Sequence, residues 1–187
     1  RDLPQEDALR GARNAKATLE AGFTTVRNVG ASDFSDIALR NMIREGVVPG
    51  PRIVAAGNAI GITGGHCDTN GYTPGILERD PEHGIADGDA EIIKAVRYQV
   101  KHGADVIKTC ATGGVLSEGD AVGVQQYSDE ELVVLVTEAH LTGRKVAAHA
   151  HGAEGIKAAL RAGVDSIEHG SMTDDEAIAL FKKTGAF

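Results

Sequence analysis

A unit that recurs five times along the chain constrains the fold more than any other feature. Each copy is an amphipathic stretch, a glycine, a short apolar or β-branched run, and a polar residue at its end. We interpret each copy as a helix, a left-handed helix end and a buried strand. The glycines are Gly22, Gly46, Gly103, Gly143 and Gly163, and the predicted strands are residues 23–27, 51–56, 104–108, 145–149 and 164–169.

Helices between every pair of strands predict right-handed crossovers and a parallel sheet in an α/β fold. Because the carboxyl ends of parallel strands meet at one edge, we expect Arg27, Lys108, His149 and His169 to converge there. The many glycines and the 4% aromatic content suit an α/β barrel or a doubly wound sheet. No linker divides the chain, so we expect a single domain.

Composition limits the possible partners. The formal charge of −8, with 19 basic residues scattered among 27 acidic ones, argues against a nucleic-acid partner. No apolar run is long enough to span a membrane, and the start of the chain lacks the layout of a signal peptide. The chain has no initiator Met and stops where a new strand would begin, so we expect a fragment. We expect a cytoplasmic location, with a signal peptide upstream of Arg1 as the open alternative.

Two long segments follow predicted strands and should cover the same edge of the sheet. They are residues 57–89 and the glycine-rich residues 112–123. Segments of this length are usually functional or disordered. Cys67 and Cys110 are too few for a disulfide framework, so we expect free thiols and leave the redox compartment open.

His149 and His169 end two consecutive predicted strands, as a pair of metal ligands would. A single strand-end histidine is more often a core residue, but two in register with a third polar strand end favour a metal site. We expect the strand to end near His149, because Gly152 and a helix start follow. His149 is therefore our predicted ligand, and His151 a substrate contact. His66, between glycines and Cys67, is either a second substrate contact or a surface turn residue.

Lys108 ends an apolar strand beside these histidines, where an ammonium would repel a metal ion. Three explanations stay open on the residues alone: pairing with a carboxylate, Schiff-base formation, or carbamylation by carbon dioxide. Arg27 would bind a substrate carboxylate or anchor Asp36, and we favour the structural role. Strand alternation predicts that Glu168 faces away from His169, toward a helix.

Four segments in this order resemble the amidohydrolase superfamily. They are residues 22–28, residues 106–108, residues 146–152, which contain His149-Ala150-His151-Gly152, and residues 166–170. The resemblance covers essentially the whole chain. Its nearest branch is the imidazolonepropionase-related enzymes, which include Xaa-Pro dipeptidase-like and arginine or lysine carboxypeptidase-like hydrolases.

The resemblance implies a (β/α)8 TIM barrel, of which residues 1–187 would be the central part, about strands two to six. It also implies two divalent metal ions, usually zinc, bridged by a carbamate on Lys108, with His149 and His169 as ligands. A metal-bridged hydroxide would attack the amide bond of a dipeptide or N-acyl amino acid. His151 and His66 match positions that line the substrate pocket. The expected partner is this small-molecule substrate; a homo-oligomer is an open alternative.

The chain departs from the family pattern in two places. The family's His-x-His pair after strand one and its strand-eight Asp are absent from this sequence. We therefore expect the fragment alone to be inactive.

Two other readings compete with the hydrolase. The strand that ends at Lys108, followed by Thr112-Gly113-Gly114, also resembles the lysine strand of Schiff-base aldolases, which need no metal. His149 and His169 have no role in that chemistry and favour the hydrolase. The second alternative is a non-catalytic fragment.

Overall fold

Helices and parallel strands alternate along the chain, which confirms the α/β fold. The structure is a computed structural model that describes residues 4–187; Arg1 to Leu3 of the N-terminal segment lie outside the described residues. The elements are α1 (Pro4–Glu20), β1 (Thr25–Asn28), η1 (Ser32–Phe34), α2 (Ser35–Arg44), β2 (Arg52–Ala55), η2 (Pro81–His83), α3 (Gly88–Lys101), β3 (Val106–Cys110), α4 (Asp129–Leu141), β4 (Lys145–Gly152), α5 (Ala153–Ala162), β5 (Ser166–Met172) and α6 (Asp175–Thr184).

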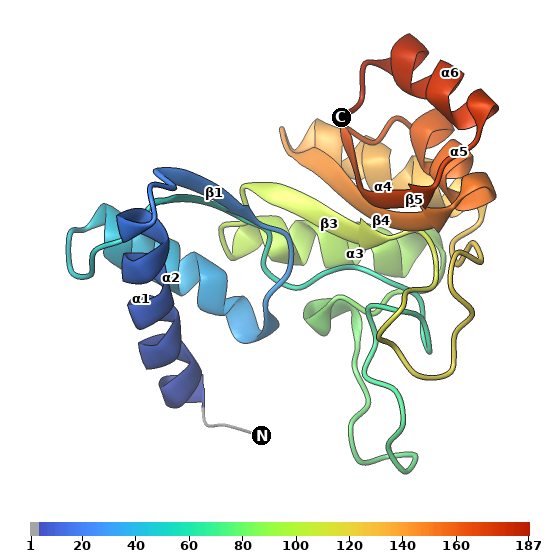
Figure 1. Cartoon of the computed structure of the whole chain (residues 1–187). Helices are drawn as coiled ribbons and strands as arrows, with labels where there is room; N and C mark the ends of the chain where they lie inside the picture. The colour runs from blue at the N-terminus through green and yellow to red at the C-terminus, as the bar shows by residue number, and fades with distance from the viewer. Residues whose placement is uncertain (1–3) are drawn as a thin grey trace.

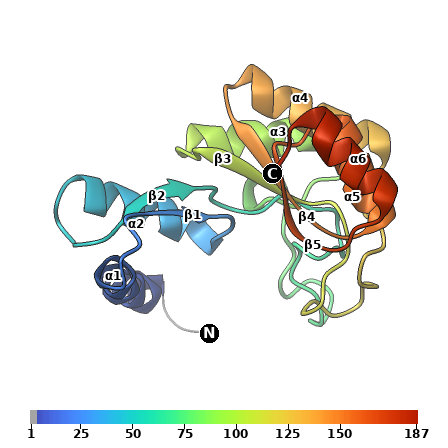
Figure 2. The same ribbon diagram turned by 45° about the horizontal axis from the view of Figure 1, so that its top comes forward.

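The strands form two parallel sheets, and the residues that follow β2 join one sheet to the other. β1 pairs with β2, and β3, β4 and β5 form the second sheet in sequence order. Beyond β2, the backbone N–H of Ile60 donates to the Lys108 carbonyl at 2.7 Å, and that of Cys110 donates to the Ile60 carbonyl at 2.9 Å. The strand order along the chain is therefore kept across both sheets (Figures 1 and 2).

Both faces of the central strands are covered. The main core lies between the sheet and its helices and includes Ile107, Val146 and Leu135. A small second core on the other face contains Ala56, Val106 and Ala147. All five residues of β3 are buried, as expected for a parallel strand with both faces packed. Lys108 shares the face of Val106 because strand residues two apart point the same way.

The five helix-ending glycines are confirmed. Their φ values are +100° at Gly22, +76° at Gly46, +99° at Gly103, +72° at Gly143 and +95° at Gly163. Glycine adopts this left-handed backbone without the penalty a Cβ would bring, so each helix ends where its glycine stands.

The prediction of free thiols is wrong, because a disulfide joins Cys67 to Cys110 with their Cα atoms 6.0 Å apart. The bond ties the long segment 57–89 to the end of β3. This segment and residues 112–123 lie side by side beyond the strand ends (Figure 1). Among the described residues, none of the helices is both long and apolar enough to cross a membrane.

Candidate metal and substrate site

Three histidines gather at the carboxyl ends of β4 and β5. One ligand nitrogen from each of His149, His151 and His169 lies within 4.8 Å of the others. The ring centroids of each pair are also 4.8 Å apart. Imidazole nitrogens at such separations can converge on one metal ion. The predicted convergence of His149 and His169 is thus present, and His151 joins them.

β4 explains the presence of His151. We expected the strand to end near His149, but it runs on to Gly152. Strand residues two apart point to the same face, so His149 and His151 project together. The Nδ1 atom of His151 is 2.7 Å from the hydroxyl of Ser171 on β5, which holds the ring in place.

His169 reaches the cluster through an unusual backbone. The strand register pairs His149 with Glu168 and Ala150 with His169, so in a regular strand Glu168 would share the face of His149. His169 instead has φ +75°, and the register shifts just beyond it. Such irregularities re-aim side chains near functional sites at a cost of roughly 1–3 kcal/mol.

This geometry corrects the prediction for Glu168. Its carboxylate does not contact a helix but pairs with Arg27 of β1 at 2.7 Å and accepts a hydrogen bond from Ser166 at 2.9 Å. Arg27 therefore has the structural role we favoured, with a different partner. Asp36, the partner we considered, instead accepts from the backbone of Ala56 and Gly57.

Lys108 is buried on the same face as the histidines. Its Nζ atom donates to the Thr109 carbonyl at 2.9 Å and lies 4.0 Å from Cys110 Sγ. Burial lowers the pKa of Lys108 to about 7, against a raising effect from Glu168. Much of this amine is therefore neutral near pH 7.

His149 has the chemistry of a metal ligand. Burial, followed by the nearby charge of Lys108, lowers its pKa to about 3, so the ring is neutral at ordinary pH. Its Nε2 atom is buried and has no hydrogen-bond partner within residues 4–187. A buried ring nitrogen without a partner is costly, and a metal ion bound to its unprotonated form would remove that cost. The donor set therefore fits a zinc-like ion.

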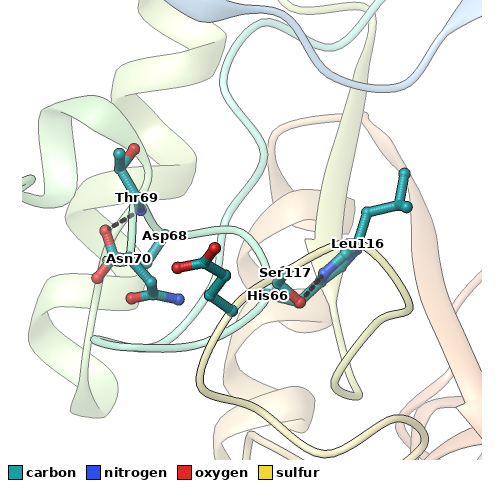
Figure 3. A pocket seen from close by; sticks show the side chains of 7 residues that line it. His66, Asp68, Thr69, Asn70, Leu116 and Ser117 are labelled. Carbon is teal, nitrogen blue, oxygen red and sulfur yellow. Dashed lines mark hydrogen bonds between the residues drawn. The ribbon is translucent and has the colours of Figure 1, made fainter. Parts of the chain in front are cut away.

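His66 approaches the cluster from the long segment after β2. Its ring centroid is 4.1 Å from that of His149, and its Nδ1 atom is 2.7 Å from Ser117 Oγ. The pocket beside it, about 390 Å³, is lined by residues of both long segments: His66, Asp68, Thr69, Asn70, Leu116, Ser117 and Glu118 (Figure 3). Both segments do lie over the same edge of the sheet, as predicted.

Sequence reasoning missed the polar residues that hold the histidines. Ser171 and Ser117 contact the rings of His151 and His66, and Asp120 supports Ser117. None lies at a predicted strand end. One signal was available for the histidine cluster, since the His149-Ala150-His151 spacing matches a continuing strand.

One family model and three known proteins match this chain in sequence or structure. A sequence model of the amidohydrolase family matches residues 3–187. Ochratoxinase from Aspergillus niger is 37% identical over 195 residues, which cover 97% of this chain and 40% of ochratoxinase. A Xaa-Pro dipeptidase with methionine bound in its active site is 45% identical with a TM-score of 0.97, covering 100% of this chain and 46% of that one. A prolidase complexed with N-methylphosphonate-L-proline is 35% identical with a TM-score of 0.87 and the same coverage. The chain spans less than half the length of each.

Proposed function

The chain belongs to the amidohydrolase family, and we propose that the full-length protein is a metal-dependent hydrolase that cleaves the amide bond of a dipeptide or an N-acyl amino acid. The observation that carries the proposal is the convergence of His149, His151 and His169 at the strand ends. Similarity to ochratoxinase and to Xaa-Pro dipeptidase and prolidase structures supports the substrate class.

Residues 1–187 would form the central part of a single (β/α)8 TIM barrel, about strands two to six. The parallel strands in chain order support this, as does the Arg27–Glu168 pair, which joins β1 to β5 although these strands belong to different sheets. In such barrels the active site lies at the carboxyl ends of the strands, where the histidines stand. The remaining ligands would come from outside this chain, so we expect residues 1–187 alone to be inactive.

Lys108, as a carbamate, together with His149 and His169 would hold two divalent metal ions, and we propose zinc. The unpartnered Nε2 of His149 supports its role as a ligand. The lowered pKa of Lys108 supports carbamylation, because carbon dioxide reacts with the neutral amine. A carbamate also replaces a buried cation by an anion that a metal ion can neutralise.

The ions, when bound, would polarise the amide carbonyl and acidify a water. The chain's own residues supply the rest. His151, held by Ser171, and His66, held by Ser117, would contact the substrate. The two long segments would shield the bond that is cleaved from bulk water.

We expect a small-molecule substrate, no nucleic-acid or membrane partner, and a cytoplasmic location. The charge of −8 supports the absence of nucleic acid. A homo-oligomer remains our open alternative. Amidohydrolase membership favours the hydrolase over a Schiff-base aldolase that uses Lys108.

Metal analysis of the full-length protein tests the proposal. We expect the wild type to carry zinc-like metal and to hydrolyse members of a panel of dipeptides and N-acyl amino acids. Lys108→Ala and His149→Asn should each lose metal and most activity, because each removes a ligand. The hydrolase mechanism would be ruled out if the wild-type protein binds no divalent metal and its activity is unaffected by chelators.

His151→Asn is the matched variant for His149→Asn, since both histidines lie on β4 with their rings 4.8 Å apart. We expect it to keep the metal content and to raise KM. Loss of metal in His151→Asn would instead make His151 a ligand. Borohydride trapping of a substrate on Lys108 would support the aldolase.

A further inference from the structure

A chain of hydrogen bonds runs from Asp120 to the ring of His66. Ser117 Oγ donates to Asp120 Oδ1 at 2.5 Å. His66 Nδ1 lies 2.7 Å from the same Ser117 oxygen (Figure 3). The other oxygen of Asp120 accepts from the backbone N–H of Gly114 at 3.2 Å and from Gln126 Nε2 at 2.9 Å. Gln126 also accepts from the backbone N–H of His66 at 3.1 Å. The backbone and ring of His66 are thus both linked to one carboxylate.

The number of hydrogens fixes the direction of these bonds. An ionised carboxylate only accepts, and a serine hydroxyl has one hydrogen to donate. Burial raises the pKa of Asp120, but its hydrogen bonds from Ser117, Gly114 and Gln126 outweigh burial and lower it. Ser117 therefore donates to Asp120, and the proton between Ser117 and His66 belongs to the histidine.

We propose that Ser117 and Asp120 are positioning residues that fix His66 as its Nδ1–H tautomer, which leaves Nε2 as the acceptor nitrogen that meets the substrate. The substrate contact rests on the proposed function, whereas the tautomer does not. Nε2 makes no hydrogen bond within the described residues, so its lone pair is available. The group it binds is a hydrogen-bond donor, such as an amide N–H or an ammonium.

Packing keeps the His66 ring in this orientation. The ring lies so close to Gly114 that a Cβ there would overlap three ring atoms. His149 stands 4.1 Å away, centroid to centroid. Gly114 belongs to the same loop as Ser117 and Asp120, so this one loop sets both the orientation and the tautomer of the His66 ring.

Asp120→Asn tests the proposal because it keeps the shape of the side chain and reverses the two hydrogen bonds that run from residue 120 through Ser117 to His66. Two N–H donors, from Gly114 and Gln126, face one oxygen of Asp120, so the amide oxygen of Asn takes that place. The amide nitrogen then faces Ser117 Oγ and donates to it. The serine hydroxyl turns and donates to Nδ1, which drives His66 to its Nε2–H tautomer.

The experiment is ¹⁵N NMR of the full-length protein with labelled histidine, at a pH where His66 is neutral, with the signal assigned by its loss in His66→Gln. We expect the wild type to show a protonated Nδ1 and a bare Nε2, and Asp120→Asn to show the reverse. Glu118→Gln is the matched control, since it removes the same charge from the same loop without a bond to His66; its tautomer should stay that of the wild type.

Nε2–H in the wild type would overturn the proposal, as would an unchanged tautomer in a folded Asp120→Asn. If that variant does not fold, Ser117→Ala should lose the Nδ1–H preference and Ser117→Thr should keep it. In steady-state kinetics, Asp120→Asn should lower kcat/KM about tenfold by raising KM, because the variant loses one hydrogen bond to the substrate. If His66 has the expected tautomer but the protein hydrolyses none of the substrates, the proposed function is contradicted and the tautomer proposal stands.

Discussion

Lys108 shows how one buried side chain limits the chemistry around it. Its ammonium would lie beside the neutral ring of His149, with Glu168 as the nearby negative charge that raises the pKa of Lys108. The residues alone left three roles open for this lysine. Burial does not choose among them, but it supplies the neutral amine that two of them require.

Carbamylation of Lys108 should follow the neutral fraction of its amine. With a pKa of about 7, that fraction rises from about a tenth at pH 6 to about nine-tenths at pH 8. We expect metal-free full-length protein to take up ¹³C-labelled carbon dioxide about tenfold faster at pH 8 than at pH 6, at equal dissolved carbon dioxide. A carbamate signal in ¹³C NMR measures the uptake.

Lys108→Ala is the control for the carbamylation experiment and should show no such signal. An equal rate at both pH values would mean that the Lys108 amine is not the group that titrates. A carbamate signal that persists in the variant would place the modification on another lysine.

At the scale of the element, the sequence predicted features that depend on local residues, but not features that depend on tertiary contacts. Gly103 and Gly143 end helices because the left-handed turn is a local property of glycine. The end of β4 depends on pairing with β5, and the spacing of His149 and His151 was the local signal that the strand continues. Glu168 was assigned to the wrong face because alternation assumes regular backbone, and His169 breaks it.

The disulfide was missed for a similar reason. Cys67 and Cys110 are 43 positions apart, and only the fold brings their Cα atoms together. Within the site, the strand ends predicted His149 and His169. The residues that hold the rings, Ser117 and Ser171, lie off the predicted strand ends and left no signal in the sequence.

Reduction of the Cys67–Cys110 bond should loosen the segment that carries His66. Closing a loop of 43 positions restricts the unfolded chain, for which the chain-entropy model gives about 4 kcal/mol of stabilisation. We expect reductant to lower the free energy of unfolding of the full-length protein by about 2–4 kcal/mol in urea titrations.

Cys67→Ala separates this effect from a general effect of reductant. The variant should be less stable than the oxidised wild type and should not respond to reductant. If reductant lowers the stability of wild type and variant equally, the bond does not carry the stabilisation.

At the scale of the whole molecule, Arg27 and Glu168 connect the first and last described strands. Their side chains are 39% and 20% exposed, so the pair is only partly screened by water. Removal of one partner leaves the other charge partly buried without its counterion. The pair should therefore help to hold the two sheets in one curved surface.

Arg27→Met should destabilise the full-length protein by about 1–3 kcal/mol, because Glu168 loses its ion pair while it keeps its hydrogen bond from Ser166. Urea unfolding of Arg27→Met, Glu168→Gln and the double variant, all metal-free, gives the coupling energy. Strictly additive effects would show that the two side chains do not stabilise each other.

The backbone of His169 sets opposing requirements at a single position. Its φ of +75° is a conformation that glycine adopts freely and that a histidine adopts only under constraint. Replacement by glycine would relax the backbone and abolish the imidazole. Fold stability and the proposed role of His169 as a metal ligand would thus favour different residues at position 169.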